Sequence, residues 1–237
     1  MSSPPATNTE AAWVTGLLQA GDSFYPTGSY AHSFGLEGLV QEGMVHDRES
    51  LRRYLLLSVR PALRHTDLPL AAQAWRALAE PDWSRVGDLG RLAHALKIAP
   101  EARQAAENIG RQRIEFLAGL RAGSLATECL DQVAAGKWPC SPPLAAAVEG
   151  RVFGAPLPAV LAGVYYSTVA SLLAAAMKLL RLGQQGAQTL LTEMLALAPA
   201  TIADAMATPA GEIGWFNPWL DIAAARHQAA DSRLFIS

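Results

Sequence analysis

The chain has 237 residues, of which 51% are hydrophobic and 17% charged, so it can bury a core and does not belong to the disordered class. Its 19 basic and 21 acidic residues give a net charge of −2, and no strongly basic stretch supports nucleic-acid binding. The two cysteines, Cys129 and Cys140, are too few for a disulfide framework and lack CxxC spacing, which favours a reduced cytoplasmic compartment.

The N-terminal part combines a polar start with a turn. Residues 1–12 have neither a basic beginning nor an apolar run, so they are expected to be a flexible tail rather than a secretory signal. Further on, Pro26 and Gly28 favour a turn. Ser29 can then accept hydrogen bonds from the first free amides of a helix.

The predicted helix after this turn carries aromatic and polar residues. Tyr30, Phe34 and Glu37 share one face at steps of four and three residues, and His32 lies round another side. Gly35 costs about 1 kcal/mol relative to alanine inside a helix, which invites the close approach of another backbone. An aromatic helix packed in the core is the simpler explanation of the same pattern, because such stripes are usually buried.

Apolar residues recur at three- and four-residue steps through most of the chain, and alternating strand patterns are almost absent. The expected helices are 47–63, 69–75, 82–96, 100–117, 124–136, 153–183, 188–198, 199–207 and 218–230. Segment 137–143 contains three prolines and is expected to be a rigid connector. The sequence predicts an all-α fold, a single-domain bundle of roughly ten helices spanning residues 1–237 around a central apolar helix.

The central helix is predicted within residues 153–177, which contain no charge and are long enough to span a bilayer. Pro156 and Pro158 lie near its start, and bulky and small residues fall on different faces. That pattern favours a core helix packed closely on several sides over a membrane span.

Motifs that carry chemistry are absent from the sequence. There is no GxxxxGK[ST] phosphate loop, no dinucleotide fingerprint, no HExxH zinc motif and no GxSxG nucleophile elbow. The five histidines are scattered, whereas a metal carrier would concentrate imidazoles or thiols. The sequence therefore predicts no catalytic residue, no cofactor site and no metal ligand.

The C-terminal residues 231–237 are unusually apolar for a chain end. Leu234, Phe235 and Ile236 follow Arg233 behind an alanine-rich helix. We expect this segment to be a docking tail, packed on the chain's own body or on a partner.

The ordered motifs resemble those of the UreF family of urease accessory proteins. The matching residues are Leu17-Leu18-Gln19, Phe24, Pro26, Gly28-Ser29-Tyr30, His32-Ser33, Gly35-Leu36-Glu37, Thr66-Asp67-Leu68-Pro69, Glu101 to Gly110, Lys178 to Gln184, and Ser232-Arg233-Leu234-Phe235. They cover nearly the whole chain in order. Lys178 departs from the family, in which arginine is common at this point, and it lacks the planar two-pronged geometry of arginine.

The resemblance implies a cytoplasmic, non-enzymatic scaffold without a cofactor. Members of the family bind the accessory protein UreD, also called UreH, and the GTPase UreG, and the assembly engages apo-urease. Nickel is delivered there with GTP hydrolysis, and the UreF subunit is expected to form a homodimer. Nucleic acid and membrane are not expected partners.

The resemblance also implies partner-binding residues. On this hypothesis the GTPase-facing surface contains Tyr30, His32, Glu37, Lys178 and Arg181, and the tail Ser232, Arg233, Leu234 and Phe235 docks in or beside the UreD contact. Phenylalanine and arginine are both enriched at interface centres, which agrees with such a role for the tail.

The alternative is a small all-helical enzyme with a buried polar pocket, in which His32 and Glu37 act as acid and base. In a continuous helix these two residues lie about 140° apart, so their side chains would not converge.

Overall fold

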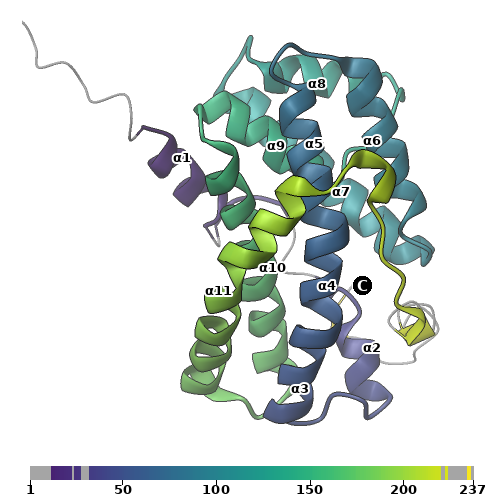
Figure 1. Cartoon of the computed structure of the whole chain (residues 1–237), viewed down its shortest axis with the longest axis vertical. Helices are drawn as coiled ribbons and strands as arrows, with labels where there is room; N and C mark the ends of the chain where they lie inside the picture. The colour runs from purple at the N-terminus through teal and green to yellow at the C-terminus, as the bar shows by residue number, and fades with distance from the viewer. Residues whose placement is uncertain (1–11, 23, 28–31, 220–221, 224–233, 236–237) are drawn as a thin grey trace, which may run out of the picture.

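The computed structural model describes residues 12–22, 24–27, 32–219, 222–223 and 234–235. Over those residues the chain is α-helical and forms no β-strand, which confirms the predicted all-α class. Figure 1 shows an elongated bundle with α6, α8 and α9 towards one end and α2, α3, α10 and α11 towards the other. The elements are α1 Ala12–Ala20, α2 Leu36–Gln41, α3 Arg48–Tyr54, η3 Leu55–Val59, α4 Arg60–Ala62, η4 Leu63–Asp67, α5 Leu68–Ala77, α6 Trp83–Ala95, α7 Pro100–Leu120, α8 Leu125–Ala134, α9 Pro142–Phe153, α10 Leu157–Leu179, α11 Gly183–Ala207 and the short 3-10 turn η5 Ala210–Glu212.

Elements α3 to α5 form one continuous helical rod, not the two helices predicted over 47–63 and 69–75. The π-helical turns η3 and η4 join its three α-helical parts. Pro61 and Pro69 each follow one of these turns. Proline lacks an N–H and clashes with the carbonyl four residues earlier, and the wider π turn shifts that carbonyl aside. The rod therefore passes through both prolines without ending.

Both π turns bind the segment that follows η5. The amide of Gly214 donates to the carbonyl of His65 at 2.9 Å, and His65 is four residues before Pro69. The side-chain amide of Asn217 donates to Ser58 Oγ in η3 at 3.0 Å. The irregular turns thus hold the returning C-terminal part of the chain along the rod.

Two large apolar clusters and a small third one fill the bundle, and the rod contributes to both large ones. The first joins α2, the rod, α10 and α11, and the second joins α5 to α9 with the connector. In the first cluster Tyr165 of α10 is fully buried, and its hydroxyl donates to the Met194 carbonyl at 2.8 Å. Helix α10 is therefore the core helix that the sequence predicted. By length and composition alone, α10 and α11 would each also suit a membrane span, with 50% and 33% of their most apolar windows buried.

Helix α11 corrects a second prediction that relied on a proline. It is continuous through Pro199, where separate helices over 188–198 and 199–207 were expected. The missing N–H of Pro199 leaves the carbonyl of Leu195 without its helical partner. Leu195 is on the exposed side of the helix, where water can donate a hydrogen bond to that carbonyl. Of the helix predicted over 218–230, residues 218–219 and 222–223 are helical and the rest lies outside the described residues.

The proline connector 137–143 is packed within the bundle. Trp138 and Cys140 are both buried in the second cluster. Helix α7 crosses the connector so closely that a Cβ at Gly110 would overlap the carbonyl oxygen of Cys140. The glycine is required there because two backbones touch.

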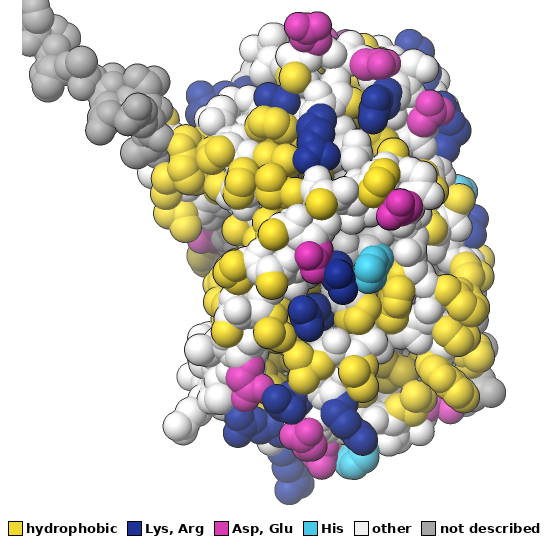
Figure 2. Space-filling view, viewed as in Figure 1, with side chains coloured by type: hydrophobic (Ala, Val, Ile, Leu, Met, Phe, Trp, Pro, Cys, Tyr) yellow, Lys and Arg dark blue, Asp and Glu magenta, His cyan; other side chains and the backbone are white. Residues whose placement is uncertain are grey.

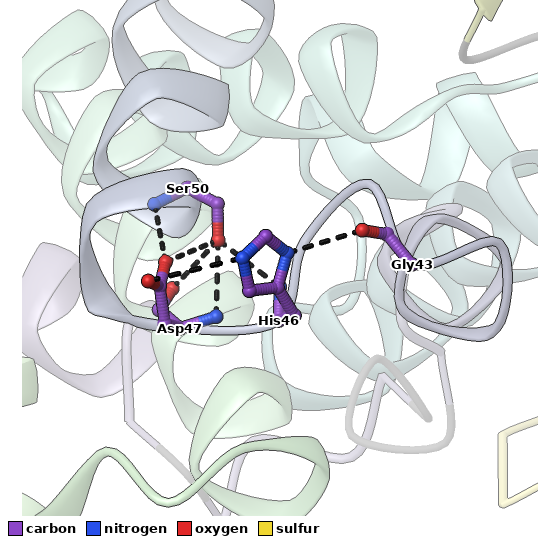
Figure 3. A network of polar contacts seen from close by, with 4 residues as sticks. All are labelled: Gly43, His46, Asp47 and Ser50. Atoms are coloured by element: carbon purple, nitrogen blue, oxygen red, sulfur yellow. Dashed lines mark hydrogen bonds and ion pairs between the residues drawn. The ribbon is translucent and has the colours of Figure 1, made fainter.

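The rod begins with a capping box at Asp47 (Figure 3). Asp47 Oδ1 accepts hydrogen bonds from the Ser50 amide at 2.8 Å and from Ser50 Oγ at 2.6 Å. The Asp47 amide in turn donates to Ser50 Oγ at 3.0 Å. These hydrogen bonds hold the pKa of the Asp47 carboxyl below its ordinary value. His46, beside it, contacts the Gly43 carbonyl through Nδ1.

The substitution Gly110→Ala should destabilise the chain by about 1–3 kcal/mol, because the added methyl group forces the connector away from α7. Thermal unfolding should show a melting temperature lower by about 3–10 °C. Gly119→Ala, in the same helix but with open space around its Cβ position, is the matched control. The control should keep or raise the melting temperature. Equal melting temperatures for the two variants would contradict the close approach.

The substitution Asp47→Ala should lower the melting temperature at pH 7, because the first turn of the rod loses its cap. The depressed pKa of Asp47 means that this contribution is fully present above the ordinary carboxyl pKa of 3.8. It is lost as the pH falls through the lower folded-state value. The difference in melting temperature between wild type and variant should therefore narrow as the pH falls below 3.8. Asp47→Asn, which keeps a cap without charge, should show a smaller loss that is nearly independent of pH.

Candidate partner-binding site

Helix α2 begins at Leu36 and not directly after Ser29. Phe34 and Gly35 have φ values of 54° and 87°, in the left-handed region that an α-helix cannot include. The predicted shared helical face of Tyr30, Phe34 and Glu37 was therefore wrong. Gly35 adopts the left-handed backbone conformation just before the helix. The close approach of another backbone that was expected at Gly35 occurs instead at Gly38. A Cβ on Gly38 would lie 2.7 Å from the carbonyl oxygen of Ala223.

Glu37 joins the first turn of α2 to the C-terminal tail. Its carboxylate is buried, with 4% of the residue exposed. Oε1 accepts the amide hydrogen of Leu234 at 2.7 Å, and Oε2 accepts that of Phe235 at 3.0 Å. Both oxygens of one buried carboxylate thus bind consecutive amides of a segment almost two hundred residues away, which fixes the tail's position and direction.

The side chain of Phe235 completes this contact. It is 5% exposed and belongs to the first apolar cluster. Lys178, at the end of α10, places its Nζ 5.2 Å from the centre of the Phe235 ring, within range of a cation–π interaction. Leu234 instead leaves 61% of its surface exposed. The structure therefore brings together four predicted interface residues, Glu37, Lys178, Leu234 and Phe235, which we call the tail site.

The other predicted site residues lie away from the tail site or outside the residues that the structure describes. His32 is buried before α2, with its ring centre 6.2 Å from that of Phe34. Burial lowers its pKa, and nearby Glu101 opposes that shift. Arg181 is exposed between α10 and α11, and Pro26 is exposed in the turn after α1. Gly28, Ser29, Tyr30, Ser232 and Arg233 lie outside the described residues.

A buried ion pair supports the turn near Pro26, and it was not predicted from the sequence. Arg113 of α7 and Glu149 of α9 form a two-pronged pair, with only 15% and 2% of their side chains exposed. Tyr25 packs edge-on against Phe116, with ring centres 5.0 Å apart. Burial, reinforced by the charge of Glu149, raises the pKa of the Tyr25 hydroxyl. In the sequence Arg113 and Glu149 look like ordinary charges on helix surfaces, so only the packing of α7 on α9 reveals the pair.

The enzyme alternative requires a polar pocket that contains His32 and Glu37. A cavity of about 290 Å³ lies between the rod, α7 and α10, and neither residue lines it. Asp67 and Lys97 are at its wall, and burial raises the pKa of the Asp67 carboxyl. Within the described ranges no three His, Cys, Asp or Glu side chains are grouped to hold a metal ion. The geometry thus favours the tail site over this cavity as the candidate functional feature.

The substitution Glu37→Gln should loosen the tail. Glutamine replaces one acceptor oxygen with an NH₂ group that meets a backbone N–H, so one charge-assisted hydrogen bond is lost and the other is weakened. A loss of about 2 kcal/mol corresponds to about thirtyfold faster hydrogen exchange at the amides of Leu234 and Phe235. Glu49→Gln, at an exposed carboxylate on α3, is the control and should leave this exchange unchanged. Unchanged exchange in Glu37→Gln would mean that the carboxylate does not hold the tail.

Comparison with known proteins gives a consistent result. A family model described as UreF matches residues 45–195. The chain is 30% identical over 221 residues to "Urease accessory protein UreF" of Arthrobacter sp. (strain FB24), covering 93% of this chain and 96% of that protein. Proteins of the same description from Lachnoclostridium phytofermentans and Bacillus sp. (strain TB-90) are 27% and 24% identical and cover 95% and 93% of this chain, and 99% and 97% of their own lengths.

These matches extend over most of the chain and include all of the rod and α10. The chain belongs to the UreF family of urease accessory proteins.

Proposed function

We propose that this protein is a non-enzymatic scaffold that joins UreD/UreH and recruits and regulates the GTPase UreG during GTP-dependent nickel insertion into apo-urease. Membership of the UreF family supports a role in urease maturation. The tail site is the structural observation that supports this proposal most directly. Nickel is the cargo in this proposal, and the protein itself acts in the cytoplasm as a homodimer.

The tail site has the features of a docking surface. Phe235 and the carboxylate of Glu37 are buried, so the tail backbone is fixed against α2. Leu234 nevertheless leaves most of its surface exposed, and Lys178, which packs on the ring of the neighbouring Phe235, is exposed as well. An exposed apolar group on a fixed backbone suits a partner contact, because little conformational entropy remains to be lost on binding.

The contact also links the two segments that carry the family motifs. A partner that binds the exposed Leu234 would depend on both motifs, because the buried Glu37 carboxylate holds the amides of Leu234 and Phe235 in place. We assign the UreD/UreH contact to the tail, and the GTPase-facing surface to α2 and the end of α10, with Tyr30, His32 and Arg181 as further candidates.

The test is co-purification of this chain with its UreD/UreH and UreG partners, followed by urease activation with nickel, bicarbonate and GTP. The wild-type chain should form the complex and support nickel-dependent activity. Deletion of residues 231–237 should abolish co-purification with UreD/UreH while the circular dichroism spectrum stays helical, because the rod, α10 and α11 keep their packing on one another. Glu49→Gln is the control and should bind normally.

Two results would each contradict a different part of the proposal. Retention of UreD/UreH by the deletion variant would reject the tail as the docking element. Urease activation that is indifferent to the presence of this chain would reject the scaffold function itself.

A further inference from the structure

Helix α1 is an apolar helix that lies on the surface. Its sequence, AWVTGLLQA, contains no charged residue, and none of its residues is buried. Val14 and Leu18 are 38% and 69% exposed. In Figure 2 hydrophobic side chains gather over α1, on the left of the view, and the apolar area continues onto the neighbouring body. Such a contiguous apolar area on a soluble body marks an interaction surface.

A hollow of about 440 Å³ lies between α1 and the body. Trp13 of α1 and Trp75 of α5 contribute indole rings to it, and Arg151 of α9 contributes a guanidinium group. Gly154 and Pro156, from the turn between α9 and α10, complete its rim. The hollow therefore combines two large aromatic surfaces with one positive charge.

Arg151 is held in place by Trp75 through two contacts. Its Nε donates to the Trp75 carbonyl at 2.7 Å, and its guanidinium carbon lies 3.3 Å from the centre of an indole ring of that residue. The Trp75 carbonyl is in the last turn of α5, where carbonyls have no helical partner, so this hydrogen bond has a structural purpose. It uses one of the five N–H donors of arginine.

The remaining donors of Arg151 face the hollow without an acid. Among the residues that the structure describes, no carboxylate lies within ion-pair distance of its guanidinium group. Burial alone lowers the pKa of the Arg151 guanidinium group. The indole N–H of Trp75 is also buried, and no described residue accepts its hydrogen bond. Two neighbouring donor groups therefore lack an acceptor, and the positive charge lacks a counter-charge.

We propose that α1 and the Arg151 hollow form a docking surface for a partner protein segment that presents a carboxylate between apolar side chains. The carboxylate would receive both terminal nitrogens of Arg151 in the two-pronged geometry that guanidinium favours. Its apolar neighbours would cover Trp13, Val14 and Leu18.

The charge of Arg151 and the amino-acid composition of the surface both favour a protein segment that carries a carboxylate. A fixed guanidinium with free paired donors matches a carboxylate in shape as well as in charge. Tryptophan and arginine are the residue types most enriched at the centres of protein interfaces. A free small anion would use the guanidinium but would leave the exposed face of α1 uncovered, so a protein segment accounts for more of the surface.

The experiment follows the indole N–H signals of the ¹⁵N-labelled full chain by NMR. The probes are two capped peptides, Ser-Leu-Phe-Glu-Leu-Ser and its Gln counterpart, and sodium acetate at matched concentrations. The Glu peptide should shift the Trp13 and Trp75 signals and bind at least about tenfold more tightly than the Gln peptide. Acetate alone should produce no saturable shift in the same concentration range.

Three variants separate recognition from structure. Arg151→Gln should remove the preference for the Glu peptide. Arg151→Lys keeps a donor for the Trp75 carbonyl and a positive charge but loses the paired geometry, so it should fold normally and retain only a small preference. Arg111→Gln, at an exposed arginine paired with Glu115 on α7, is the matched control and should behave as wild type.

Several results would overturn the proposal. Equal affinity of the wild-type chain for the Glu and Gln peptides would leave Arg151 with its structural contact alone. A preference that survives at full strength in a folded Arg151→Lys protein would reject the two-pronged recognition. Acetate binding as tightly as the Glu peptide would identify a small-anion site. Indole shifts that follow the protein's own concentration, and vanish in Arg151→Gln, would identify a second copy of this chain as the occupant.

Discussion

The helical rod from α3 to α5 is the constraint on which the rest of the structure depends. It is the element that both large apolar clusters share, so α10 and α11 on one side and α6 to α9 on the other are placed relative to it. Its two prolines would ordinarily end a helix, and the π turns before them let it continue. The same turns present Ser58 and the His65 carbonyl to Asn217 and Gly214. The irregularity of the rod therefore determines the path by which the chain returns towards α2.

That return path explains how the two ends of the sequence meet in one site. Ala223 lies against α2 so closely that only glycine fits at position 38, and the chain then reaches Glu37 with the amides of Leu234 and Phe235. Buried carboxylates need hydrogen-bond donors, and the consecutive backbone amides of Leu234 and Phe235 supply two of them here. The family motifs near both ends are thus parts of a single structural unit.

The sequence predicted most helices because their signals are local. Asp47, Asp82 and Ser124 stand at the starts of three predicted helices and cap them through their side chains, and the apolar spacing of α10 identified the core helix. The prediction was wrong at Pro69 and Pro199. Whether a proline ends a helix depends on which group accommodates the carbonyl four residues earlier, which loses its helical hydrogen bond. The tail site was predicted only as a set of candidate residues. Its geometry could not be predicted, because the partners of Glu37 are almost two hundred residues away and a left-handed Gly35 moves the start of α2.

A buried ion pair and two cations packed on aromatic rings differ in what they leave for a partner. Arg113 and Glu149 satisfy each other in the interior, so their pairing stabilises one arrangement of α7 and α9 and leaves little for a ligand. Lys178 and Arg151 instead lie beside aromatic rings at the surface, at opposite ends of α10. A helix of 23 residues separates such points by on the order of 30 Å. Two protein partners could therefore bind at these two points at once, as the proposed scaffold function would require.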